Sequence, residues 1–281
     1  MTDRGVVYCA TSQAVYLEAA LISSIALRQL NPEIPITIFC DPALELVPFS
    51  TLQDSLQTYG IDIIKLSMEG DAFLSRSVKT HLNELSPYQE TLYIDSDMLP
   101  LKSISQVWDY LDHGDMAMVL DRLPRLGMCD HVAQVEIDYT LKLLPSDTHQ
   151  FNSGLMVWRN NDATQSLFKQ WQEEWAVFQK HDQLALMRAI ATEKVAVAQM
   201  PVNYNTSPRD AAPVMLPNND VYLLHCWGGQ VASGDYLKVA LEFHPKAVAI
   251  VKQLLNSPRI NFGLVEEAAP QLRKEGFITN S

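Results

Sequence analysis

The chain has 281 residues, of which 47% are hydrophobic and 19% are charged, as is typical of a folded globular protein. This length is sufficient for one large domain or two small ones. The formal net charge of −12 argues against a protein that binds nucleic acid or anionic lipid through its overall charge. An acidic protein that binds a phosphorylated ligand must therefore neutralise it locally, with a few cationic side chains or a metal ion.

Strand and helix patterns alternate through the first part of the chain. Helical patterns occupy residues 14–30, 51–59 and about 71–85, and each is followed by a glycine or proline that favours helix termination. Four short apolar runs of strand length accompany them: VVYCA (6–10), ITIFC (36–40), IDIIKL (61–66) and TLYI (91–94). Short apolar strands separated by helices predict a mostly parallel sheet that is covered on both faces.

The patterns are less regular after residue 121. AMVLD (117–121) and GLMVW (154–158) are typical of strands, whereas 122–150 has no clean periodicity. Later patterns predict a helix over 163–190 with a break near His181-Asp182, strands at 195–200 and 221–226, and a helix over 236–255. No repeat, low-complexity tract or linker divides the chain. We therefore predict one α/β domain whose C-terminal half is irregular.

The cysteines and the N-terminal segment bear on the cellular compartment. Cys9, Cys40, Cys129 and Cys226 form no CxxC pair and show no repeated spacing, so free thiols in a reducing compartment are expected. The N-terminal segment lacks a signal-peptide pattern, and no run has the apolar length of a transmembrane segment. We expect a cytoplasmic protein.

Two aspartates follow the apolar run TLYI in the segment TLYIDSDMLPL. Ligands of parallel α/β sheets bind beyond the carboxyl ends of the strands. Asp95 and Asp97 point to the same side if the backbone there is extended. Two converging carboxylates suit Mg²⁺ or Mn²⁺. The alternative is a loop whose aspartates cap a following helix.

A histidine ends another apolar run, VYLLHC, and is followed by Trp227-Gly228-Gly229. His225 is thereby placed where a ligand pocket is expected, although a lone histidine at this point also suits a purely structural role. Together with the two aspartates, an imidazole gives a mixed oxygen and nitrogen set that favours Mn²⁺ over Mg²⁺.

Further polar residues lie at predicted element ends. Arg76 and Lys79 share one face of the predicted helix at 71–85, where they either reach a diphosphate or form a solvated cationic face. Asn152 precedes the strand at 154–158 and suits sugar hydroxyls, or a turn. Asp182 and Gln183 stand at a helix start, where Asp182 is either an N-cap or, with Gln183, part of a site for a polyhydroxylated ligand.

The order of these motifs resembles a known family. A hydrophobic strand followed by DxD, then FN(S/A)G, a DQ helix start and H-x-x-G, is similar to the GT-A glycosyltransferases. In particular it resembles the retaining family 8, which includes glycogenin-like and lipopolysaccharide galactosyltransferase-like enzymes. The segment SRSVKTHLNELSPYQETLYIDSDMLPLKSI (75–104) resembles that family's arginine-bearing helix and DxD strand.

The resemblance implies a fold and an activity. The fold is a single GT-A domain over 1–281 with a Rossmann-like, mostly parallel sheet flanked by helices. Its parts are a nucleotide-binding half (1–121), a donor-sugar and acceptor half (122–235) and a C-terminal helical tail (236–281). The activity is metal-dependent transfer of a sugar from a nucleotide-diphosphate sugar, with a UDP-sugar expected, to an unknown acceptor with retention of configuration.

The resemblance also implies roles for single residues. Mn²⁺ or Mg²⁺ is held by Asp95, Asp97 and His225. The catalytic group, which holds the donor sugar, is Asn152, Asp182 and Gln183. Donor-binding residues are Ala10, Thr11, Tyr16, Arg76, Lys79, Asp95, Ser96 and Gly228.

The sequence departs from the family at two places. The family often continues H-x-x-G-x-x-K-P-W, but Val231 stands at the lysine position, so that Lys79, Arg209 or Lys238 would have to replace it. The first loop, TSQAVY, lacks the family's acidic residue.

Three other classes fit parts of the sequence. A haloacid-dehalogenase-type phosphatase has a strand-end DxD, although normally after its first strand. A nucleotidyltransferase that makes nucleotide-sugars requires a Gly-rich basic loop after the first strand. A non-catalytic protein that binds a sugar-nucleotide agrees with the missing lysine.

Overall fold

The computed structural model describes residues 2–44, 46–66, 74–209 and 220–256. The chain divides into two compact units. Unit 1 comprises Met1–Cys9, Ser67–Ile94 and Ser105–Asn205, and unit 2 comprises Ala10–Leu66, Asp95–Ile104 and Thr206–Ser281. Each unit is built from several chain segments. The single domain expected over 1–281 stays a prediction.

The central sheet has seven strands in the order β3-β2-β1-β4-β7-β6-β8. It is mixed: the pairs β2–β3, β1–β4 and β6–β8 are parallel, whereas β7 is antiparallel to both β4 and β6. The α/β class with a mostly parallel sheet and flanking helices is thus confirmed. The strands are β1 (Thr2–Ala10), β2 (Ile36–Cys40), β3 (Ile61–Lys65), β4 (Tyr88–Ile94), β6 (Met116–Arg125), β7 (His149–Arg159) and β8 (Val197–Met200).

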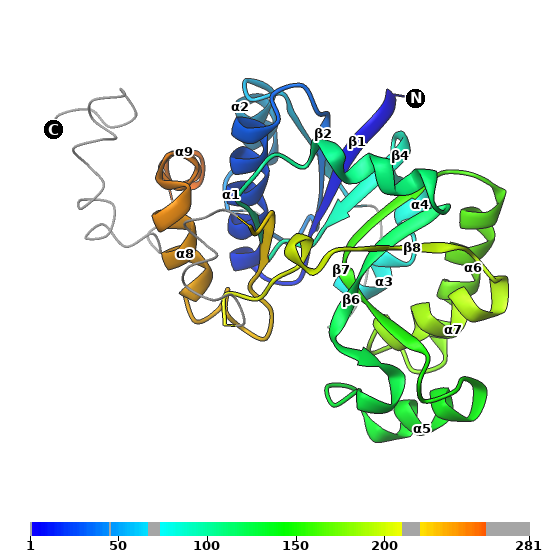
Figure 1. Cartoon of the computed structure of the whole chain (residues 1–281). Helices are drawn as coiled ribbons and strands as arrows, with labels where there is room; N and C mark the ends of the chain where they lie inside the picture. Colours follow the sequence, from blue (N-terminus) through cyan, green and yellow to red (C-terminus); the bar gives the residue numbers. More distant parts are fainter. Residues whose placement is uncertain (1, 45, 67–73, 210–219, 257–281) are drawn as a thin grey trace, which may run out of the picture. The chain divides into compact units, whose positions relative to one another are not determined.

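Unit 1 packs helices against β7 around an aromatic core. Its helices are α3 (Leu74–Lys79), α4 (Leu82–Leu85), α5 (Gln134–Leu143), α6 (Asp162–Ala176) and α7 (Gln183–Glu193). Trp158 of β7 is fully buried and packs on Phe168 of α6, which in turn packs on Trp171. Figure 1 shows α6 and α7 side by side next to β7. Helix α6 begins at a capping box formed by Asn161 and Thr164, which satisfies amides of its first turn.

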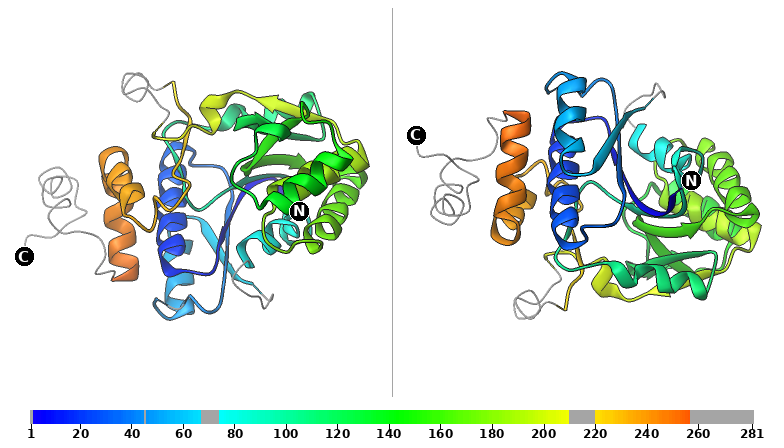
Figure 2. Two further views of the ribbon diagram at one scale, coloured as in Figure 1. Left: turned by 90° about the horizontal axis from the view of Figure 1, so that it is seen from below. Right: turned by 90° about the horizontal axis from the view of Figure 1, so that it is seen from above.

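Unit 2 places α1 (Ala14–Leu30) between β2 and the C-terminal helices. Figures 1 and 2 show α1 beside α8 (Asp235–Phe243) and α9 (Pro245–Leu255), and α2 (Phe49–Gln57) packs on β3 and α9. A second sheet joins β5 (Met98–Pro100) to β9 (Leu223–His225). Asn31, at the end of α1, accepts hydrogen bonds from Ser103 Oγ at 2.7 Å and from the Ile104 amide at 3.1 Å.

Two of the predicted helices differ from the structure. The helix expected over 71–85 is two short helices, α3 and α4, and its first three residues lie outside the described part of the chain. The helix expected over 236–255 is interrupted by Pro245, which begins α9 because proline suits a first helical turn but not a helix interior.

Helix α5 was not predicted at all, and its burial pattern explains why. Its buried residues include Glu136 and Thr140, which contact Arg188 of α7. Val135 and Leu143, by contrast, are exposed. Ile137 is buried as well, so polar and apolar residues are mixed on the buried side and the usual amphipathic pattern is weak.

Candidate active site

The β5–β9 ribbon of unit 2 brings the DxD motif to the histidine. Met98 is paired with His225 in register, and the Cys226 amide donates to the Asp97 carbonyl at 2.9 Å. His225 is held further by its own amide, which donates to the Thr206 carbonyl at 2.9 Å. Two strands of three residues each therefore align segments that are far apart in the sequence.

The three residues predicted as metal ligands lie together. Asp95, Asp97 and His225 each offer one ligand atom, and these atoms lie within 4.8 Å of one another. His225 Nε2 lies 3.3 Å from Asp97 Oδ1. Two carboxylates and an imidazole are donor types that suit Mn²⁺, and also Mg²⁺ with fewer protein ligands. The residues present thus fit a divalent cation.

The backbone of the DxD segment differs from the prediction. Residues 95–97 form a turn, closed by the Met98 amide donating to the Asp95 carbonyl at 3.0 Å, so the expected extended geometry is wrong. The turn leads into β5 and not into a helix. The alternative of aspartates that cap a following helix is therefore excluded.

Several residues that neighbour Asp95, Asp97 and His225 in the sequence are buried or conformationally restricted. Ser96 and Cys226 are buried, and burial together with the Asp97 and Asp235 carboxylates raises the pKa of the Cys226 thiol to about 12. All four cysteines of the chain are free, as expected. Gly228 has a φ of +69°, and a Cβ there would meet open space. The glycine is therefore required by the backbone conformation of this turn.

The residues predicted to face the nucleotide base lie at the end of β1 (Ala10), in the following loop (Thr11) and in the first turn of α1 (Tyr16). Ala10 and Thr11 are buried and Tyr16 is partly exposed. Thr11 Oγ1 is buried and makes no hydrogen bond to any described residue. Ser12, next to it, has a φ of +69°, a strained conformation that often marks functional loops. The Asp41 carboxylate, from the end of β2, accepts from the Ser12 amide at 3.4 Å, so an acidic group reaches this loop from another segment.

Unit 1 holds Asp182 in a polar cluster. Ser153 Oγ donates to Asp182 Oδ2 at 2.6 Å, Lys79 Nζ lies 3.7 Å from Oδ2, and Arg76 Nε lies 3.8 Å from Oδ1. Burial alone would raise the pKa of Asp182, but Lys79, the Ser153 hydrogen bond and Arg76 together hold that pKa below its usual value. Asp182 thus carries a stabilised negative charge.

The structure decides between the two interpretations of several of these residues. Asp182 occupies the N-cap position of α7, as the N-cap alternative expected, but its side chain makes no capping hydrogen bond. The Lys79 side chain is only 10% exposed, against 37% for Arg76, so these residues do not form a solvated face. Both cations contact the carboxylate of Asp182.

Asn152 and Gln183 are joined by a residue that was not predicted. Asp121 Oδ2 accepts from Asn152 Nδ2 at 3.1 Å and from Gln183 Nε2 at 3.2 Å. Asp121 stands toward the end of the strand pattern AMVLD, and this position was the only sequence signal available for it. The predicted group Asn152, Asp182 and Gln183 therefore lies in unit 1 with Asp121 and Ser153 as additional members.

The candidates for the missing family lysine lie in different surroundings. Lys79 contacts Asp182 in unit 1, and Lys238, which is 67% exposed, pairs with Asp235 at 3.1 Å. Arg209 stacks over the Trp227 ring at 6.0 Å, two residues from His225 in the sequence. Val231 itself is buried, and it lines a hollow of about 150 Å³ together with Glu18 and Ala19 of α1.

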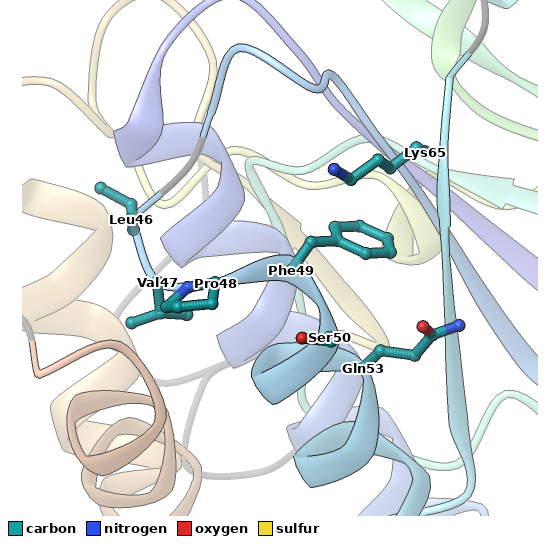
Figure 3. A pocket seen from close by; sticks show the side chains of 7 residues that line it. All are labelled: Leu46, Val47, Pro48, Phe49, Ser50, Gln53 and Lys65. Atoms are coloured by element: carbon teal, nitrogen blue, oxygen red, sulfur yellow. The ribbon is translucent and has the colours of Figure 1, made fainter.

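A larger hollow of unit 2 contains none of the predicted site residues. Its volume is about 680 Å³, and Figure 3 shows its lining side chains from the segment just before α2, from α2 itself and from β3. Lys65 Nζ lies over the Phe49 ring at 4.7 Å from the ring centroid. The lining residues are Leu46, Val47, Pro48, Phe49, Ser50, Gln53 and Lys65.

The sequence profile of the nucleotide-diphospho-sugar transferase family matches residues 55–230 of this chain. The chain belongs to this family. The matched residues include the DxD turn, Asn152, the start of α7 and the His225 loop. The chain is thus a member of a nucleotide-sugar glycosyltransferase family, and no curated protein matches it in sequence.

Several solved glycosyltransferase structures share the fold of this chain. The galactosyltransferase LgtC, in complex with donor and acceptor sugar analogues, matches with a TM-score of 0.54 at 13% identity, over 85% of this chain and 96% of LgtC. GlyE of Streptococcus pneumoniae TIGR4 matches with a TM-score of 0.59 at 15% identity, over 91% of this chain and 64% of GlyE. Mouse xyloside xylosyltransferase 1 matches with a TM-score of 0.52 at 12% identity, over 80% and 97%. These matches confirm the predicted GT-A fold.

None of the helices within the described residues is long and apolar enough to cross a membrane.

Proposed function

We propose that this member of the transferase family moves a sugar from a nucleotide-diphosphate sugar to an acceptor in a reaction that depends on a divalent cation. The observation that carries the proposal is the convergence of Asp95, Asp97 and His225 within 4.8 Å, in a chain whose family uses nucleotide-diphospho-sugars. By its resemblance to family 8, we further propose a uridine nucleotide and retention of the anomeric configuration.

A divalent cation held by Asp95, Asp97 and His225 would supply the local positive charge that an acidic protein needs to bind a diphosphate. A bound Mn²⁺ or Mg²⁺ would neutralise the donor diphosphate and the negative charge that grows on it as the glycosidic bond breaks. Asp95, Asp97 and His225 would hold the cation, and Gly228, with open space beside its backbone, would admit the diphosphate. Arg209 is the cation of unit 2 that we propose in place of the family's lysine, because Trp227 positions it and an arginine fork suits phosphate oxygens.

The polar cluster of unit 1 has the chemistry for sugar hydroxyls. Asp182 is an ionised acceptor, and Asn152 and Gln183 carry amides whose donor and acceptor ends are both fixed in direction. We propose that these three residues bind the donor sugar, with Arg76 and Lys79 keeping Asp182 ionised. Thr11 and Tyr16 would bind the base, and the buried hydroxyl of Thr11 supports this role.

A panel of nucleotide-sugars tests the proposal. The protein is incubated with each donor, with and without Mn²⁺, and released nucleoside diphosphate is measured for the wild type, Asp97→Asn and the control Asp235→Asn. Metal-dependent release that is lost only in Asp97→Asn is the expected result. Inorganic phosphate released from small phosphoesters would instead identify a phosphatase. Donor binding without turnover would identify a non-catalytic protein.

The stereochemistry and the cellular location need their own measurements. Proton NMR of the first-formed product distinguishes retention from inversion through the anomeric coupling. We also propose a cytoplasmic location, which the four free cysteines support because thiols stay reduced there. Recovery of the protein in a membrane or secreted fraction would contradict that location.

A further inference from the structure

We infer that Asp121 is a positioning residue that fixes the orientation of the Gln183 amide, so that Gln183 offers its carbonyl oxygen, and not its NH₂ group, to a bound ligand. This inference rests on the proposed function for the identity of the ligand, a sugar hydroxyl of the donor. The orientation itself rests on the hydrogen bonds of unit 1 alone.

The carboxylate of Asp121 accepts hydrogen bonds from three donors. Oδ2 accepts from Gln183 Nε2 at 3.2 Å and from Asn152 Nδ2 at 3.1 Å, and Oδ1 accepts from the Leu123 amide at 2.9 Å. Asp121 is only 8% exposed, so water competes little for these oxygens. The Leu123 contact fixes which oxygen faces the backbone and which faces the two amides.

The polarity of the two amides follows from chemistry. An ionised carboxylate accepts hydrogen bonds but donates none, so any amide that contacts it must turn its NH₂ group toward it. The carbonyl oxygen of each amide then faces the opposite direction. In Asn152 that oxygen is used within the protein: Oδ1 accepts from the Gly154 amide and from Asn205 Nδ2, both at 3.0 Å.

Gln183 differs from Asn152 in what its oxygen contacts. Its NH₂ group is held by Asp121, and no hydrogen bond to Gln183 Oε1 occurs among the described residues. Gln183 stands in the first turn of α7, directly after Asp182, whose carbonyl is fixed by Trp171 Nε1 at 2.9 Å. A helix start and a carboxylate partner thus orient one acceptor oxygen on the residue that follows Asp182 in the sequence.

Reversing the polarity of Asp121 without changing its shape tests the inference. In Asp121→Asn the new oxygen can keep the Leu123 bond, and the new NH₂ group then opposes the NH₂ groups of Gln183 and Asn152. We expect the Gln183 amide to turn over and kcat/KM to fall roughly tenfold to hundredfold, since buried donors are left facing donors. Asp130→Asn, which alters an exposed aspartate paired with Arg122, is the matched control and keeps wild-type kinetics.

A second substitution restores the complementary polarity. Gln183→Glu alone places two carboxylates against each other, whereas in the double variant Asp121→Asn with Gln183→Glu the new amide at position 121 donates to the new carboxylate at position 183. We expect the double variant to exceed the product of the two single effects by at least about fivefold. Strictly multiplicative effects would overturn the positioning role, because a merely structural Asp121 would not depend on residue 183.

Side-chain amide NMR gives a readout that needs no activity. In protein labelled with ¹⁵N-glutamine, the Gln183 NH₂ signals, assigned by their loss in Gln183→Ala, shift in Asp121→Asn and stay in place in Asp130→Asn. Unchanged Gln183 signals in Asp121→Asn overturn the inference, whatever the kinetics. If the signals shift but the wild type turns over no nucleotide-sugar, the amide orientation holds and the proposed function fails.

Discussion

Asp182 in unit 1 and the pair Asp95–Asp97 in unit 2 are carboxylates with different partners. Asp182 lies near two permanent cations and accepts a hydrogen bond from Ser153. Asp97 lies 3.3 Å from the imidazole of His225, a group that can serve as a neutral metal ligand. The protein itself thus balances the first carboxylate, whereas the second set has the donor types of a cation site. The partners of each carboxylate indicate its role.

The largest expected effect follows from a substitution in the cation site of unit 2. We expect Asp97→Asn to lose sugar transfer by about a hundredfold or more, since it removes a direct metal ligand. It should also abolish the rise in Tm that Mn²⁺ causes by binding the folded state. Calorimetry with and without Mn²⁺ checks the second point, with Asp235→Asn as the control. An unchanged Mn²⁺ response in Asp97→Asn would place the metal elsewhere.

The second prediction concerns Asp182 of unit 1, whose negative charge faces two cationic side chains. Asp182→Asn removes the carboxylate that faces buried Lys79 at 3.7 Å and should cost about 3 kcal/mol of unfolding free energy, measured by urea denaturation. The Mn²⁺-dependent rise in Tm should persist. The double variant Lys79→Met with Asp182→Asn should recover part of the lost stability, because the buried ammonium is then removed together with its carboxylate. Loss of the Mn²⁺ response in Asp182→Asn would mean that the two carboxylate sites are not independent.

The third prediction concerns pH. The pKa of folded Asp182 lies below its ordinary value of 3.8, so its charge stabilises the fold above that value and the stabilisation is lost as the pH falls through the lower, folded-state pKa. The difference in unfolding free energy between wild type and Asp182→Asn should shrink as the pH falls below about 3.8. Urea titrations at several pH values measure it. A difference that grows on acidification would contradict the charged state of Asp182.

The smallest expected effect concerns the diphosphate near the cation site. Arg209→Gln should raise the donor KM about fivefold, as expected for the loss of one charge-assisted contact of about 1 kcal/mol. Lys238→Gln, which removes an exposed lysine paired with Asp235, should leave KM unchanged. Steady-state kinetics over a range of donor concentrations separate the two variants. Equal effects of both substitutions would indicate a diffuse charge effect and no specific role for Arg209.

The sequence predicted the local elements well because their signals are local. The broad apolar pattern of 14–30 predicted α1 with its observed bounds, and ITIFC predicted β2. The convergence of Asp95, Asp97 and His225, by contrast, depends on the pairing of β5 with β9, and a strand of three residues has no periodicity to detect. The motif order suggested the metal set, but the turn that shapes it was not predictable.

The polar network of unit 1 was only partly predictable for a similar reason. Asn152, Asp182 and Gln183 were identified by their places at element ends, whereas the role of Asp121 depends on contacts with residues of β7 and α7. The N-cap position of Asp182 was predictable locally, whereas the contacts of its side chain with Ser153 and Lys79 were not. Long-range partners decided which of two local interpretations holds.

The burial of Val231 makes the departure from the family difficult to reverse. Its side chain lines the same hollow as Glu18 of α1. A lysine introduced at position 231 would have a carboxylate within that hollow as a competing partner, and its ammonium would be drawn into the interior of unit 2. One codon change would therefore not restore a phosphate-binding lysine. A return to the family's lysine at this position therefore concerns Glu18 as well as Val231.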